Sequence, residues 1–154
     1  MDVIKQVFSN RILATGLCAW AAAQVIKTII HAIINKGIDF TRLFGDGGMP
    51  SGHSATVTAV AASCGFQCGF DSPIFAVAAI LAVVVMHDAT GVRWETGKQA
   101  AILNDLMDAM QDLNLDIPGD QKLKLFVGHT PLQVFFGSLL GIILSAISYG
   151  LWRA

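Results

Sequence analysis

Long apolar runs alternate with short polar segments along this chain, and their lengths predict helices that cross a membrane. Four such runs lie at about residues 12–34, 52–70, 74–88 and 131–152. A helix needs about 20 apolar residues to cross the hydrocarbon core of a bilayer. The fold class that this pattern predicts is all-α, an integral membrane helical bundle of about four transmembrane helices, in a single domain over residues 1–154.

Polar residues gather in one sizeable segment between the third and fourth runs, residues 88–128. Apolar side chains from Ala100 to Leu113 share a broad helical face there, which predicts an amphipathic surface helix over residues 97–115. We expect this helix to cap the bundle. The first ten residues predict a short amphipathic helix along the membrane surface, without the pattern of a signal peptide.

Composition strengthens the membrane prediction. Of the 154 residues, 54% are hydrophobic and 14% are charged, whereas an ordinary soluble domain has about 25% charged residues. The mean hydropathy is +0.61. A net charge of −1 without a basic block argues against nucleic-acid binding. The three cysteines show neither metal-site spacing nor a disulfide framework, and we interpret them as small buried hydrophobic residues.

Four crossings would place both termini on one side of the membrane and residues 35–51 and 88–128 on the other. The loop side carries more lysine and arginine, so the positive-inside rule predicts that the loops face the cytoplasm. The loop-side cations are Lys36, Arg42, Arg93, Lys98, Lys122 and Lys124, and the terminal-side cations are Lys5, Arg11 and Arg153.

A glycine-rich turn opens the second apolar run. Ser51 is a good N-cap, and Pro50 tolerates a position at the start of a helix. The backbone amides of Gly52 and His53 would then lie at the positive end of the helix dipole, which predicts an anion site. The alternative is a capped helix with an incidental histidine.

Two further polar clusters fall on the same side of the predicted bundle. One combines Lys27, inside the first run, with Arg42 of the following loop. A lysine inside a span normally faces a cavity or a partner, and the alternative is that it snorkels to the interface. The other cluster combines Asp88, Arg93 and His129.

These clusters contain what phosphoryl transfer needs, namely cations around the phosphoryl oxygens, an in-line nucleophile and an acid for the leaving oxygen. Lys27, Arg42 and Arg93 can supply the cations. The histidines His53 and His129 can divide the nucleophile and acid roles. The scheme needs no metal or other cofactor, and the four histidines lack zinc-ligand spacing.

At this point the chain resembles a known family. Residues 47–55, Gly-Gly-Met-Pro-Ser-Gly-His-Ser-Ala, are similar to the central motif of the type-2 phosphatidic acid phosphatase superfamily, which also includes vanadium haloperoxidases. Residues 88–104 and 128–134 resemble the divergent branch of small membrane proteins in that superfamily. The resemblance covers about residues 10–151 and implies a phosphatase that works through a phosphohistidine.

The resemblance implies a role for each residue that matches a motif. His129 would be the nucleophile and His53 the general acid. Ser51, Gly52 and Lys27 would bind the substrate phosphate.

Other positions depart from the superfamily pattern. Arg42 would stand for the first-motif arginine at a longer spacing from the lysine than usual. The third-motif arginine is replaced by Leu123, and Arg93 would substitute for it. The usual aspartate after the third-motif histidine is replaced by Gln133, and Asp88 would supply that carboxylate.

The leading hypothesis is a metal-independent integral membrane phosphatase for a lipid phosphomonoester. The substrate classes are phosphatidylglycerophosphate, phosphatidate, and polyprenyl phosphate or diphosphate. The alternative is a catalytically weak or inactive membrane protein that uses the same anion pocket for lipid binding or assembly. A vanadate-dependent peroxidase is disfavoured by the high hydrophobicity. The expected partners are the bilayer and the lipid substrate, without nucleic acid, and a homo-oligomer is left open.

Overall fold

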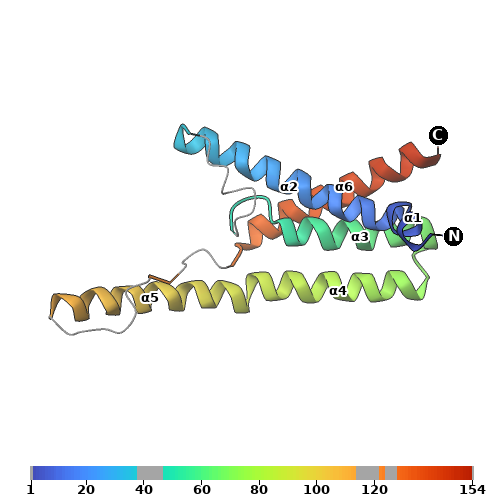
Figure 1. Cartoon of the computed structure of the whole chain (residues 1–154). Coiled ribbons are helices and arrows are strands. Elements are labelled where there is room, and N and C mark those ends of the chain that lie inside the picture. The colour runs from blue at the N-terminus through green and yellow to red at the C-terminus, as the bar shows by residue number, and fades with distance from the viewer. Residues whose placement is uncertain (1, 38–46, 114–121, 124–127, 154) are drawn as a thin grey trace.

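The computed structural model describes residues 2–37, 47–113, 122–123 and 128–153. These residues form helices and connecting turns without a strand. The helices are α1 (Val3–Phe8), α2 (Arg11–Asn35), α3 (Gly52–Cys68), α4 (Pro73–Thr90), α5 (Val92–Asp112) and α6 (Pro131–Arg153). Both termini lie at one end of the bundle, and the first turns of α3 and α6 lie toward the other, as Figure 1 shows. The predicted all-α fold is confirmed.

Local sequence determines where the helices begin. Asn10, Ser51 and Ser72 are the N-caps of α2, α3 and α4. In each case the side-chain oxygen accepts a hydrogen bond from the backbone N–H three residues later, at 3.0 to 3.3 Å. Such caps satisfy amides that have no acceptor inside the helix. Pro73 and Pro131 occupy the first helical position, where a missing N–H costs nothing.

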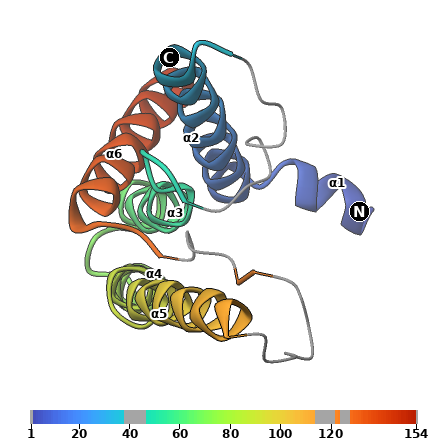
Figure 2. The same ribbon diagram turned by 90° about the vertical axis from the view of Figure 1, so that its left-hand side faces the viewer.

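Helix α3 is the central element and packs against α2, α4 and α6 (Figures 1 and 2). Gly137 and Gly141 of α6 face it so closely that a Cβ at either position would clash with the α3 chain. These two glycines therefore allow the close approach of α6 to α3. Alanines complete the interface with α2, and small residues of this kind allow close helix packing in a bilayer. The fully buried alanines are Ala19, Ala23, Ala55 and Ala59.

Hydroxyl pairs join the helices farther from the loop end. Ser63 of α3 and Ser145 of α6 lie 2.9 Å apart, as do Thr15 of α2 and Ser148 of α6. Each pair satisfies polar atoms that lipid cannot hydrate, so the contacts stabilise one packing arrangement.

Three stretches are long and apolar enough to cross a membrane, namely α2, the run Pro73–Asp112 and α6. Helix α3 has 17 residues, which is about 26 Å at 1.5 Å per residue, against a hydrocarbon core of about 30 Å. Large apolar side chains point outward from α2, α4 and α6, including Ile29, Val77 and Ile142. The described helices fit a multi-pass membrane protein, and a fourth crossing by α3 stays a prediction.

Helix α5 does not cover the bundle. It continues past Gly91 roughly along the axis of α4 and projects beyond the other helices (Figure 1). Among the described helices it contacts α4 alone. Helix α5 instead contacts the chain that returns from it toward α6. The Asn104 side chain donates a hydrogen bond to the Leu123 carbonyl at 3.0 Å and accepts one from the Leu123 N–H at 2.9 Å. The predicted helix is confirmed, although it begins earlier, at Val92, and its place at the membrane surface stays a prediction. The expectation that it caps the bundle is wrong.

Candidate active site

The glycine-rich turn before α3 folds directly over Lys27. Gly47 and Gly48 have φ angles of +79° and +84°, which only glycine adopts easily. A Cβ at Gly48 would lie 3.0 Å from Cγ of Lys27. The Lys27 residue is only 6% exposed. It therefore lies inside the bundle beneath the turn, and the alternative that it extends to the membrane interface does not hold.

Ser51 organises the start of α3. It is fully buried, and its Oγ accepts hydrogen bonds from the Ser54 amide at 3.3 Å and the Ser54 hydroxyl at 3.0 Å. The amides of Gly52 and His53 belong to the same first turn, where a helix offers them no carbonyl acceptor. These donors and the helix dipole favour an anion at this end of α3.

His129 is held against the junction of α4 and α5. Its backbone N–H donates to the Ala89 carbonyl at 3.0 Å, and the residue is 4% exposed. Gly128 lies against the Trp94 backbone, where a Cβ would clash. Main-chain contacts therefore hold His129, just before α6, next to the chain segment that carries Asp88 and Arg93, the other two members of its predicted cluster.

The two histidines meet at the loop end of the bundle. The ring centroids of His53 and His129 lie 6.0 Å apart, with 59° between the ring planes. His53 is exposed and His129 is buried. They come from the first turn of α3 and from just before α6, so two positive helix ends converge beside them. The predicted pairing of these histidines in one region matches the geometry.

Gln133, which stands where the superfamily pattern has an aspartate, contacts the His129 ring and also caps α6. Its Oε1 lies 3.1 Å from Nδ1 of His129 and accepts the Thr130 N–H at 3.1 Å. The Thr130 hydroxyl accepts the Gln133 N–H at 3.3 Å, which completes a capping box. The sequence analysis did not foresee this cap, and the Thr-x-x-Gln spacing before an apolar run is the signal that could have indicated it.

Asp88 and Arg93 form an ion pair with each other. Arg93 Nε lies 2.6 Å from Asp88 Oδ2, and both side chains are close to half exposed. The pair lies beside Ala89, which anchors the His129 backbone. The recorded side-chain partner of His129 Nδ1 is Gln133, so a carboxylate contact from Asp88 stays a prediction.

Some predicted positions take no part in the described site. Arg42 lies outside the described residues. Leu123 pairs with Asn104 on α5. Among the described histidines, cysteines and carboxylates, no group of three is arranged to hold a metal ion.

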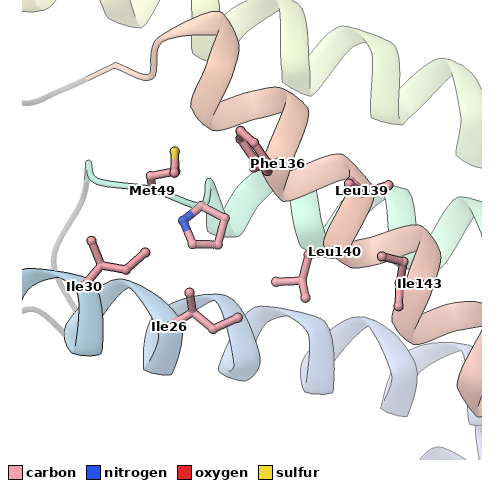
Figure 3. A pocket seen from close by; sticks show the side chains of 8 residues that line it. Ile26, Ile30, Met49, Phe136, Leu139, Leu140 and Ile143 are labelled. Carbon is pink, nitrogen blue, oxygen red and sulfur yellow. The ribbon is translucent and has the colours of Figure 1, made fainter.

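An apolar groove of about 310 Å³ runs between α2 and α6 (Figure 3). Met49 and Pro50 form one end of it and lead directly into Ser51. The groove therefore begins beside the capped turn and continues along the spans. Its lining residues are Ile26, Ile30, Met49, Pro50, Phe136, Leu139, Leu140 and Ile143.

Fold and site together define an all-α membrane protein with a buried lysine, a capped glycine-rich turn and paired histidines at one end. The family described as "Divergent PAP2 family" matches residues 8–144. The chain belongs to that family. It is similar to the uncharacterized membrane protein YuiD of Bacillus subtilis (strain 168), with 42% identity over 151 residues that cover 92% of this chain and 96% of that protein. No solved structure matches the chain significantly.

Proposed function

We propose that this protein is an integral membrane phosphatase that hydrolyses a lipid phosphomonoester through a phosphohistidine. The observation that supports this most strongly is the His53–His129 pair, with centroids 6.0 Å apart beside the capped start of α3. One phosphoryl group can contact both rings at this separation. Membership in the divergent PAP2 family agrees with a phosphatase-related role.

The reaction has two displacements. In the first, Nε2 of His129 attacks phosphorus, an N–P bond forms and the ester P–O bond breaks. His53 gives its proton to the leaving alkoxide, and the lipid alcohol departs. In the second, water attacks the phosphohistidine and gives a proton to His53. The N–P bond then breaks, which releases inorganic phosphate and restores both histidines.

The surrounding groups stabilise charge on the phosphoryl oxygens. Lys27 supplies a buried cation beneath the turn, and the amides of Gly52 and His53 supply donors. Such interactions are stronger where the groups are removed from water, as Lys27 and Gly52 are. We assign Arg93 and Arg42 to the same oxyanion, with Arg93 releasing Asp88 when the substrate binds.

The apolar groove between α2 and α6 would hold the hydrocarbon tail of the substrate. It begins at Pro50, next to Ser51, so a headgroup phosphate at the turn leaves its tail pointing along the groove. Each buried methylene contributes about 0.8 kcal/mol. The excess of lysine and arginine in the loops supports a cytoplasmic position for this end of the bundle and for the proposed site.

Phosphate release from purified protein in detergent tests the proposal. The panel contains phosphatidylglycerophosphate, phosphatidate, polyprenyl phosphate and polyprenyl diphosphate. We expect His129→Ala to lower turnover at least about 10³-fold and His53→Ala to lower it about 10²- to 10⁴-fold. The matched control is His87→Ala, an exposed histidine of α4 outside the site. Activity should survive a chelator.

The intermediate gives a second readout. A radiolabelled phosphoenzyme should form on the wild type and be absent from His129→Ala. His53→Ala should retain activity on p-nitrophenyl phosphate, whose leaving group needs no proton. A stable phosphoenzyme in His129→Ala would point to His53 or Ser51 as the nucleophile instead.

A second function is favoured by the state of Arg93. Its guanidinium is engaged with Asp88 at 2.6 Å, and an uncharged Gln133 contacts the His129 ring. These features suit a weak or inactive protein that binds a lipid phosphate without hydrolysing it. Saturable binding of phosphatidate-containing vesicles, with no phosphate released from any panel lipid, would select this function over the first.

A further inference from the structure

The side-chain oxygen of Gln133 lies between two nitrogen atoms. It is 3.1 Å from Nδ1 of His129 and 3.1 Å from the backbone nitrogen of Thr130. We infer that Gln133 is a positioning residue that holds His129 in the Nδ1–H tautomer and so directs its Nε2 lone pair to phosphorus. The kinetic part of this inference rests on the proposed phosphatase function.

The tautomer follows from the capping contact. A backbone N–H can only donate, so the Gln133 atom that faces Thr130 is the amide oxygen and not the amide nitrogen. An amide oxygen can only accept. The His129 Nδ1 that contacts the same atom must therefore carry the hydrogen. A neutral imidazole protonated at Nδ1 has its lone pair on Nε2, which is the form that a nucleophile needs.

Gln133 also links the nucleophile to the anion-binding turn. Its backbone carbonyl accepts the Ser51 N–H at 3.0 Å. One residue of α6 thus contacts the nucleophile through its side chain and the N-cap of α3 through its main chain. A side-chain substitution removes the first contact and leaves the second, so the two effects can be separated.

A glutamine differs from a carboxylate at this position. Both accept a hydrogen bond from Nδ1, but the amide adds no negative charge beside the ring. Gln133 would therefore select the tautomer without stabilising an imidazolium. Gln133→Glu provides two acceptor oxygens and can make both observed contacts, so it serves as the conservative variant.

The test compares Gln133→Met with Gln133→Glu and Thr130→Val. Methionine keeps the side-chain length and removes the acceptor. Thr130→Val removes the hydroxyl that caps α6 at 3.3 Å but leaves the Thr130 N–H and the Gln133 oxygen. It therefore controls for loss of the cap alone. Each full-length variant is labelled with ¹⁵N-histidine, and the His129 signals are assigned by their loss in His129→Asn.

We expect wild type, Gln133→Glu and Thr130→Val to show a protonated Nδ1 in His129, and Gln133→Met to show the Nε2–H tautomer. In kinetics, Gln133→Met should lower kcat by at least about 10²-fold with KM within about threefold, since a wrong tautomer costs up to about 10⁴-fold in a serine-protease triad. Gln133→Glu should retain kcat within about tenfold.

Two results would overturn the inference. An unchanged His129 tautomer in Gln133→Met would show that another group selects it. An equal loss of kcat in Thr130→Val would show that the cap alone matters. The nitrogen spectra need no turnover, so an inactive wild type with the expected tautomer would contradict the proposed function and leave the Gln133 assignment standing.

Discussion

Gly137→Ala tests the contact on which the site geometry depends. A Cβ at Gly137 would clash with the Ser51 carbonyl oxygen and lie 3.1 Å from the Ser54 side chain. The clash is with backbone, which cannot rotate away as a flexible side chain can. Gly150 lies on the same helix, and a Cβ there would meet nothing within 4 Å. The two substitutions therefore differ mainly in steric contact.

The expected difference follows from two opposing terms. Replacing glycine by alanine inside a helix stabilises it by about 1 kcal/mol. Extra volume in a packed interface costs about 1–3 kcal/mol. The helix term is shared, so Gly137→Ala should be about 1–3 kcal/mol less stable than Gly150→Ala. Because displacement of a reacting group by about 1 Å can cost 10²-fold in rate, activity should fall with it.

The assay is reversible unfolding in mixed micelles with increasing sodium dodecyl sulfate, combined with phosphate release. Gly141→Ala adds a second comparison, since its Cβ would clash with Thr58 and Ala55, one turn farther from Ser51. It should destabilise similarly and reduce activity less. If Gly137→Ala unfolds with the same free energy as Gly150→Ala and retains full activity, α6 does not contact Ser51 as described.

Three other predictions concern the oxyanion, the ion pair and the topology. Lys27→Met keeps most of the side-chain volume and removes the buried cation, so kcat/KM should fall about 10²-fold; retention of kcat/KM would remove Lys27 from the site. Vanadate should inhibit competitively, and Arg93→Ala should weaken that inhibition; unchanged inhibition would exclude Arg93 from the oxyanion site. In a cysteine-free background, Ser72→Cys and Lys98→Cys should react with impermeant maleimide from opposite faces of the membrane, and labelling from one face would contradict the four-crossing topology.

The hydrophobic pattern was sufficient to predict the helices, but not where each one ends or which parts of the chain it contacts. The third apolar run was expected to continue through Asp88, and α4 ends at Thr90. The amphipathic pattern of α5 was likewise visible in the sequence. Its position was not, because an apolar face does not indicate which surface it meets. In the structure Leu103, Leu106 and Leu113 of that face are exposed, and the polar Asn104 makes the contact with the returning chain at Leu123.

The site could be predicted only as far as residue types and helix starts carry information. Ser51 and His53 follow from capping chemistry at the start of α3. The burial of Lys27 depends on Gly48 folding over it from a distant part of the chain. The Arg93–Asp88 pair was not expected as such, because both residues had been assigned to the substrate or to a histidine. Such pairings depend on the relative positions of helices, which periodicity does not specify.

The structure also explains how a membrane bundle can hold two histidines from separate segments close together. Ser51 and Gln133 are far apart in sequence, yet the Ser51 N–H donates to the Gln133 carbonyl at 3.0 Å. Gly137, one helical turn later, leaves room for the Ser51 carbonyl. Both contacts involve main-chain atoms or an absent side chain, so neither leaves a polar signal in the sequence. The relative position of His53 and His129 therefore depends on the close approach of two helix backbones. Small residues where these helices cross are as necessary for the site as its histidines.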